Sequence, residues 1–269
     1  MEASVQRGVE GTQPPAPSGN GKRIAFKVVS AVFALGAFLG LFGIAVIFAW
    51  FDNDEGAIHR VHDMGFGVLF GVILTTGVLI QNWRPERRVS AFYQILDVAV
   101  ALLIAAALAL SGGGLFGGLI VLVAYGVLFA LHPYRSELLH PVREGFSPVL
   151  LALTVVGAVP LIAYALTTAR LQRNGLSLDP HVKQDHWTLM TAMALAIVLV
   201  AFLSSFKFRG WRISAWCAAA GLFLYGLISA VYPHKAGSEG TGWSIVAIAG
   251  AVVFAAAAEW EARRTPAGT

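Results

Sequence analysis

Residues 90–132 read SAFYQILDVAVALLIAAALAL, then SGGG, then LFGGLIVLVAYGVLFALH, so two long apolar runs lie on either side of a short glycine-rich segment. A helix rises 1.5 Å per residue, and each run is therefore long enough to cross a hydrocarbon core of roughly 30 Å. The glycines in the segment 111–114 can take the positive φ angles of a tight reversal. We therefore predict a transmembrane helical hairpin over residues 90–110 and 115–132.

Apolar runs of similar length fill most of the remaining chain. With 57% hydrophobic and 13% charged residues, the composition excludes an ordinary water-soluble globule. It predicts an all-α, polytopic membrane helix bundle of about eight transmembrane helices in a single domain, residues 22–264. The other six predicted spans are 25–51, 57–82, 148–170, 184–206, 211–232 and 241–262. Residues 1–21 are rich in Pro, Gly and Ser and predict a disordered cytoplasmic tail, and residues 265–269 a short one.

The distribution of basic residues predicts the orientation of the bundle. If the chain starts inside, fourteen of its 19 Lys and Arg residues fall in inner segments and five fall in outer segments. Cytoplasmic loops retain positive charge, so we expect both termini in the cytoplasm, in agreement with the even number of spans. The predicted location is the cytoplasmic membrane, as in a bacterial inner membrane.

Histidines and carboxylates gather at the predicted outer ends of the second and sixth spans. On a helix His59 lies about 60° from His62 and about 40° from Asp63, so these side chains share one face. His181 and Asp185 likewise lie nearly above one another. The predicted metal or haem ligands are His59, His62, Asp63, His181, Asp185, His186 and His234.

Neutral imidazole and carboxylate groups form a ligand set for zinc, copper or iron. Two such clusters on neighbouring helices can close around one ion, and an imidazole from each of two helices can also ligate a haem axially. The alternative is structural: polar side chains collect at the ends of spans because water is there, and they cap helices and hold loops together.

The segment Glu55-Gly56-Ala57-Ile58-His59-Arg60 resembles a stretched form of the Glu-x2-His-Arg motif of haem A synthases. Those proteins also have eight spans with both termini inside, and the motif enters their second span from the outer side. The resemblance implies that His59, with His186 as second ligand, can hold a haem. This chain departs from the pattern in having one extra residue between Glu55 and His59 and no outer histidine in the fourth span.

Asp97 is a carboxylate well inside the predicted third span, about 9 Å from its inner end. An ionised carboxylate is costly there, so we expect it to face the bundle interior, to be protonated or to meet a partner. Gln94, one turn earlier, lies on a nearby face, and His132 and Tyr125 of the fourth span are candidate partners. From the position of Asp97 we predict either a proton relay or a buried structural hydrogen bond.

Three functions follow from these patterns. The favoured one is a membrane protein whose outward-facing His/Asp cluster binds a transition metal or haem for redox or hydrolytic chemistry. The second is a small-solute or proton-coupled transporter that uses Asp97, and the third is a non-catalytic membrane subunit, so catalytic residues are not assigned. The expected partners are membrane lipid and a second copy or another membrane subunit; no nucleic-acid-binding module is present in the sequence.

Overall fold

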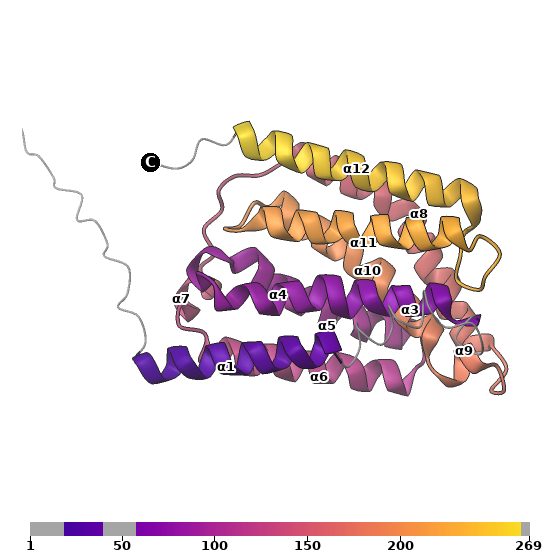
Figure 1. Ribbon diagram of the computed structural model, residues 1–269, viewed down its shortest axis with the longest axis horizontal. Helices are drawn as coiled ribbons and strands as arrows, with labels where there is room; N and C mark the ends of the chain where they lie inside the picture. The colour runs from indigo at the N-terminus through magenta and orange to yellow at the C-terminus, as the bar shows by residue number, and fades with distance from the viewer. Residues whose placement is uncertain (1–18, 40–57, 265–269) are drawn as a thin grey trace, which may run out of the picture.

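The computed structural model describes residues 19–39 and 58–264. All the regular secondary-structure elements in these two ranges are helices. The helices run roughly along the long axis of the molecule and form one bundle (Figure 1). An isolated bridge between Arg143 and Phe208 is the one β-type pairing in the described residues.

Seven helical segments of the described chain are long and apolar enough to cross a membrane. The first is a continuous rod, Arg60–Asn82, made of α3 (Arg60–Phe66), the π-helix η3 (Gly67–Leu74), α4 (Thr75–Leu79) and the short 3₁₀ turn η4 (Ile80–Asn82). The others are α5 (Val89–Ala109), α6 (Gly112–Leu131), α8 (Pro148–Asn174), α10 (His186–Ser205), α11 (Trp211–Val231) and α12 (Gly240–Arg264). The protein is therefore a multi-pass helical bundle of membrane type.

The predicted span 25–51 is only partly within the described residues. Its described part is α1 (Asn20–Ala37), which begins five residues before the predicted start, while residues 40–51 lie outside the described ranges. The predicted tails, 1–21 and 265–269, also lie outside them apart from residues 19–21. Three short helices complete the chain: η5 (Pro85–Arg87), α7 (Arg135–Leu139) and α9 (Pro180–Lys183).

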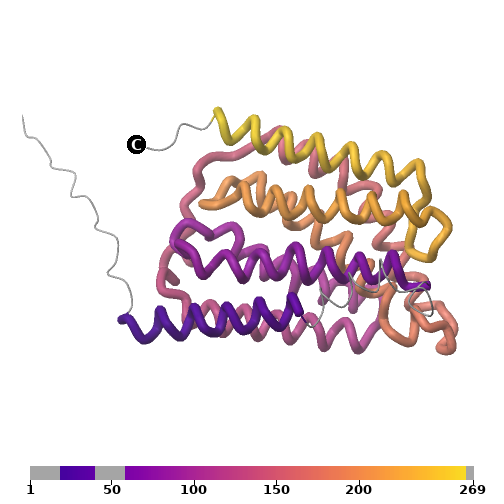
Figure 2. Tube along the Cα trace, viewed as in Figure 1, coloured from indigo at the N-terminus to yellow at the C-terminus, as the bar shows by residue number. Residues whose placement is uncertain are grey.

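The bundle has two distinct ends. The tube in Figure 2 places the beginning of α1 and the end of α12 at one end, together with α7, whereas α9 and the beginning of α3 lie at the other. The rod and α10 form the buried centre, and the outward faces of α6, α8 and α12 carry exposed apolar side chains such as Phe116, Val156 and Val252. An apolar outer surface of this kind is what lipid requires.

The hairpin between α5 and α6 reverses differently from the prediction. Leu110, with φ 55°, takes the left-handed conformation, and the glycines that follow are already helical. Ser111 caps α6 by accepting a hydrogen bond from the amide N–H of Gly114 (2.9 Å). The glycines serve close packing instead, because a Cβ on Gly114 would meet the side chain of Thr188 at 2.6 Å.

The residues before the predicted sixth span, 184–206, form a helix of their own, and the span itself begins two residues later than predicted. Asp179 caps a separate short helix, α9, whose first residue is Pro180, and α10 starts only at His186. The break is at Asp185, whose left-handed φ of 56° turns the chain between the two helices. His181 and Asp185 therefore do not belong to one helix, and their expected stacking on one helical face is wrong.

The π-helix in the middle of the rod leaves backbone carbonyls available for side-chain donors. The hydroxyl of Thr75 donates to the carbonyl of Phe70 (2.7 Å), and the amide of Gln94 on α5 donates to the carbonyl of Ile73 (2.6 Å). Buried carbonyls need such partners inside a membrane bundle. Thr75 of the rod itself and Gln94 of α5 thus stabilise the irregular segment that follows α3.

Candidate metal centre

His59 and His62 lie at the start of α3, at the end of the bundle that also carries α9. His59 is the residue that precedes the helix, and His62 lies in its first turn. The side chain of His62 is completely buried, and neither of its ring nitrogens has a hydrogen-bond partner among the described residues. An imidazole buried without any partner is unusual because desolvation of a polar group costs free energy that a hydrogen bond normally offsets.

Asp179 orients the third histidine, His181. One carboxylate oxygen of Asp179 accepts a hydrogen bond from the backbone N–H of His181 (2.9 Å) and lies 3.0 Å from Nδ1 of the same residue. Burial raises the pKa of Asp179, but the two hydrogen bonds from His181, together with the electrostatic effect of His181 and His59, outweigh burial and hold the pKa below its ordinary value. Nε2 of His181 lies 3.4 Å from the carbonyl oxygen of Ile58, and in the tautomer with its proton on Nδ1 this nitrogen offers a lone pair.

His186 is the first residue of α10 and completes a group of four imidazoles. Its Nδ1 lies 2.9 Å from Nδ1 of His59, so one of the two nitrogens donates and the other accepts. Ring centroids in the group are separated by 4.4 Å (His59 to His186) up to 6.4 Å (His59 to His62). We call His59, His62, His181 and His186 the histidine cluster.

Three members of the cluster approach one another closely enough to hold one ion. The ligand atoms of His59, His62 and His181 lie within 4.8 Å of one another. Zinc–nitrogen bonds of about 2.0–2.1 Å place tetrahedral ligand atoms roughly 3.3 Å apart, so modest side-chain rotations would bring these nitrogens to bonding distance.

Aromatic rings and a glycine enclose the cluster. The ring of Trp187 lies 4.6 Å from that of His62, and the ring of Phe66 lies 5.5 Å from that of His186. Gly237 in the loop between α11 and α12 covers His62 so closely that a Cβ would lie 3.2 Å from its ring. The carbonyl of Gly237 accepts hydrogen bonds from the hydroxyls of Tyr164 (2.7 Å) and Tyr225 (3.2 Å), which hold the loop in place.

Two of the predicted ligands lie elsewhere. The carboxylate of Asp185 accepts a hydrogen bond from the hydroxyl of Ser111 (2.7 Å) and packs against Gly113, so it stabilises the hairpin turn instead of facing the cluster. His234 is exposed on its loop, outside the three-histidine group. Asp63 is half-buried beside the cluster, and its backbone N–H bonds to the carbonyl of His59 (2.8 Å).

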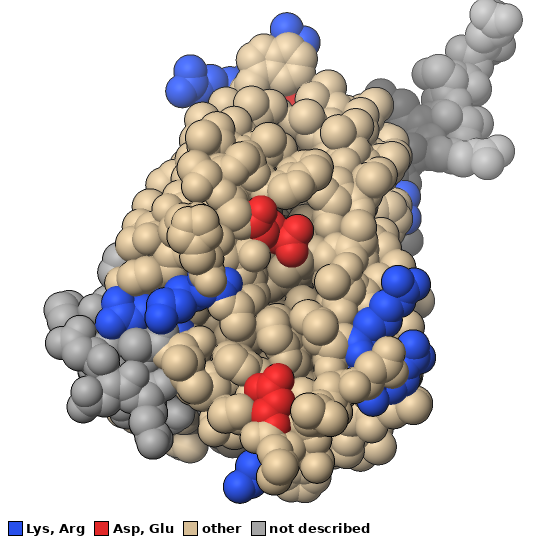
Figure 3. All heavy atoms as spheres, turned by 90° about the vertical axis from the view of Figure 1, so that its right-hand side faces the viewer, with Lys and Arg blue, Asp and Glu red and all other residues tan. Residues whose placement is uncertain are grey.

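Charged side chains do not distinguish this end of the bundle. Figure 3 looks onto it, and the Lys, Arg, Asp and Glu residues that are visible are few and scattered across a largely uncharged surface. The feature of this end is therefore its group of closely spaced imidazoles. Glu55, which carries the resemblance to haem A synthases, lies outside the described residues.

Asp97, Gln94 and His132, which were predicted to form a proton relay or a structural hydrogen bond, make separate contacts in the structure. Asp97 on α5 is largely buried, one of its carboxyl oxygens has no hydrogen-bond partner in the described chain, and it lies close enough to Tyr125 for electrostatic interaction. Gln94 donates to the π-helix, as described above. His132, one residue past the end of α6, packs between the rings of Phe26 (4.9 Å) and Phe92 (5.1 Å), and burial lowers its pKa to about 4.

Several contributors to the site were not predicted from the sequence as parts of it. Asp179, Trp187 and Gly237 were not among the predicted ligands. Their roles depend on the approach of α9 and of the loop between α11 and α12 to the start of α3.

Comparison with known proteins adds no family: no protein-family model, curated protein or solved structure matches this chain.

Proposed function

We propose that the histidine cluster binds one divalent transition-metal ion, with zinc the first candidate. The observation that carries the proposal is His62, whose two ring nitrogens are fully buried without hydrogen-bond partners while two further imidazoles offer ligand atoms within 4.8 Å. A bound cation would use the lone pair that is otherwise desolvated without compensation.

The hydrogen bonds around the cluster support three ligands and an open fourth position. In the proposed bound state the Nδ1–H of His181 donates to Asp179, the usual carboxylate–histidine arrangement behind a metal ligand, and Nε2, which lies 3.4 Å from the carbonyl oxygen of Ile58, turns to the ion. His59 can ligate through Nε2 while its Nδ1–H donates to Nδ1 of His186. In this arrangement His186 orients a ligand and leaves one coordination position for water or substrate.

Three neutral histidines with an open position are the ligand set of catalytic zinc sites. A zinc ion in such a site lowers the pKa of a bound water to about 7 and generates a nucleophile at neutral pH. We therefore propose a metal-dependent hydrolase at the end of a membrane bundle. A single ion suits the cluster better than haem, because three histidine ligand atoms already lie within 4.8 Å of one another, whereas a haem iron takes at most two axial ligands from the protein.

Asp97 supports a second candidate, a proton-coupled transporter. A largely buried carboxyl group with an unpartnered oxygen inside a membrane bundle is typical of proton relays. We rank it second because the described residues bring no second titratable carboxyl or imidazole group against Asp97. Under this alternative, Asp97→Asn abolishes pH-dependent uptake and the histidine substitutions have little effect.

The ligand assignment is tested by titrating the detergent-purified full chain with Co²⁺, whose visible spectrum reports tetrahedral coordination. We expect one equivalent to bind, and we expect His62→Gln or His181→Gln to remove the tetrahedral spectrum. His234→Gln is the matched control, because this exposed histidine lies outside the cluster, and it should bind normally. Asp97→Asn should also bind normally.

The variant His186→Gln distinguishes a metal site with three histidine ligands from a site with four. With His186 as an orienting residue, the variant still binds one Co²⁺ but more weakly, by about 10- to 100-fold. Complete loss of the spectrum in this variant would mean that His186 is itself a ligand and that no open position exists. Equal binding by all histidine variants would overturn the site.

A further inference from the structure

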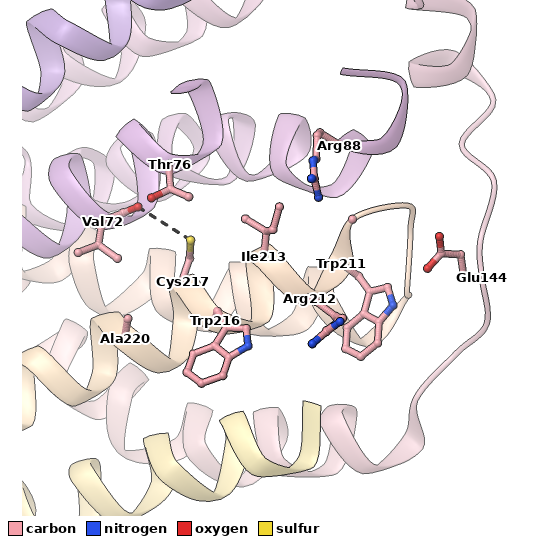
Figure 4. Close-up of a pocket in the computed structure, with 11 residues that line it drawn as sticks. Val72, Thr76, Arg88, Glu144, Trp211, Arg212, Ile213, Trp216, Cys217 and Ala220 are labelled. Atoms are coloured by element: carbon pink, nitrogen blue, oxygen red, sulfur yellow. Dashed lines mark hydrogen bonds between the residues drawn. The ribbon is translucent and has the colours of Figure 1, made fainter. Parts of the chain in front are cut away.

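A second feature, distant from the histidine cluster, is a cavity of about 530 Å³ between the rod and α11. Figure 4 shows Thr76 and Cys217 toward one end of its lining, which we call the deep part, and Arg88, Trp211 and Glu144 toward the other end, which we call the mouth. The mouth lies at the end of the bundle where α7 and the loop before α5 are found.

The deep part of the cavity suits an apolar chain. The wall that α11 contributes to the whole cavity runs from Trp211 at the mouth to Ala220 in the deep part. These positions are nine residues apart, or about 14 Å along the helix axis. The Cys217 thiol points at the carbonyl of Val72 (3.9 Å), and the other wall groups here are largely apolar. Both walls belong to helices long and apolar enough to span a membrane, so this part of the cavity lies at the depth of lipid tails.

The mouth carries one cation and one anion that the protein itself does not pair. Nε of Arg88 is buried and has no hydrogen-bond partner among the described residues, although the guanidinium lies over the ring of Trp83 (5.2 Å). Glu144 is exposed, and its carboxylate makes no hydrogen bond or ion pair with the described chain. Arg212 also lines the mouth, but Glu259 already neutralises it at 2.6 Å.

We propose that this cavity binds phosphatidylethanolamine, with one acyl chain in the apolar part and the headgroup at the mouth. The lipid phosphate complements Arg88, and the primary ammonium group, which has three N–H donors, complements Glu144. Phosphatidylcholine has no N–H donor for Glu144, and phosphatidylglycerol places an anionic headgroup without a cation beside that carboxylate. Arg88 and Glu144, which the described chain does not pair with each other or with other groups at the mouth, therefore together select an ethanolamine headgroup.

The test is native mass spectrometry of the full chain released from nanodiscs that contain equal amounts of the three lipids. We expect phosphatidylethanolamine to be retained about tenfold more than either competitor, the factor for one additional charge-assisted hydrogen bond. Arg88→Gln should reduce retention of all three lipids, whereas Glu144→Gln should remove the preference for phosphatidylethanolamine over both competitors without reducing the retention of phosphatidylcholine. Ala220→Phe, which fills the apolar part, should abolish retention.

Arg84→Gln is the matched control, because Arg84 is an exposed arginine near Arg88 that does not line the cavity. This variant should retain phosphatidylethanolamine as the unmodified chain does. Equal retention of the three lipids, a preference for phosphatidylglycerol, or the same loss in Arg84→Gln as in Arg88→Gln would overturn the proposal. The last result would show that only the general positive charge of the loop matters.

Discussion

Among single residues, Asp179 has the clearest separable role. Its carboxylate contacts both the backbone N–H and Nδ1 of His181, so it fixes the direction of that ring and favours a proton on Nδ1. A negative charge behind a ligating imidazole also increases the basicity of the ligand. The contribution of Asp179 to metal binding is therefore indirect and should be measurable without destroying the site.

We predict that Asp179→Asn lowers the metal affinity by about 10- to 100-fold without abolishing binding, because asparagine still caps α9 but loses the charge. Competition with a chromogenic chelator measures this. Asp185→Asn is the matched control: it is a nearby carboxylate bonded to Ser111, and asparagine tolerates its left-handed φ. An equal loss of affinity in both variants would contradict the orienting role of Asp179.

Sequence spacing predicted the histidines of the cluster better than the carboxylates. His59 and His62 are close in sequence and at the start of one helix, so their proximity followed from helical geometry. Asp185 was misplaced because its side chain depends on a left-handed residue and on the approach of the α5–α6 turn, which local spacing does not specify. Gly237 could not have been assigned at all, since it meets His62 from a distant loop.

At the scale of elements, the π-helix Gly67–Leu74 is the least regular part of the membrane core. It depends on donors from outside its own backbone, of which Gln94 makes the shortest contact, to the carbonyl of Ile73. A buried carbonyl that loses its donor pays a desolvation cost of about 1–3 kcal/mol. This contact gives Gln94 a structural role that is independent of any proton relay.

We predict that Gln94→Leu lowers the free energy of unfolding by about 1–3 kcal/mol and leaves metal binding intact. Thermal unfolding in detergent, followed by circular dichroism, measures the first effect. Gln184→Leu, at an exposed position, is the control for the same chemical change and should alter stability by less than about 0.5 kcal/mol. Unchanged stability in Gln94→Leu would mean that the π-helix does not need this donor.

Helix existence and approximate length followed from the sequence, whereas helix ends did not. Seven of the eight predicted spans correspond to described helices because about twenty apolar residues can bury their backbone only as helix within a membrane. The observed helix ends differ from the predicted ones where local backbone conformation and capping determine the end. Ser111 caps α6, which therefore begins at the glycines, and Asp185 separates α9 from α10. The π-helix had no sequence signal, since its apolar pattern also fits an α-helix.

For the whole molecule, the predicted topology assigns each end of the bundle to one side of the membrane, and this assignment stays a prediction. The beginning of α1 and the end of α12 lie at the same end of the bundle, and the histidine cluster lies at the other (Figure 1). The excess of basic residues at the first end predicts that it faces the cytoplasm. The proposed metal site then faces outward.

Cysteine labelling tests this orientation. In a Cys217→Ser background, which removes the single native thiol, we predict that Leu178→Cys reacts with a membrane-impermeant maleimide in intact cells. His140→Cys should react only after the membrane is permeabilised. Both positions are exposed and lie in connecting segments, so accessibility differs only by side of the membrane. The opposite labelling pattern would invert the topology and place the histidine cluster in the cytoplasm.

The most direct test of the account is elemental analysis of the full chain, purified in detergent without metal-affinity chromatography or chelator. The account predicts about one zinc or other transition-metal ion per chain, and an almost complete loss of this metal from His62→Gln purified in the same way. A folded chain that contains no metal, and that takes up neither Zn²⁺ nor Co²⁺ when they are supplied, would contradict the central claim.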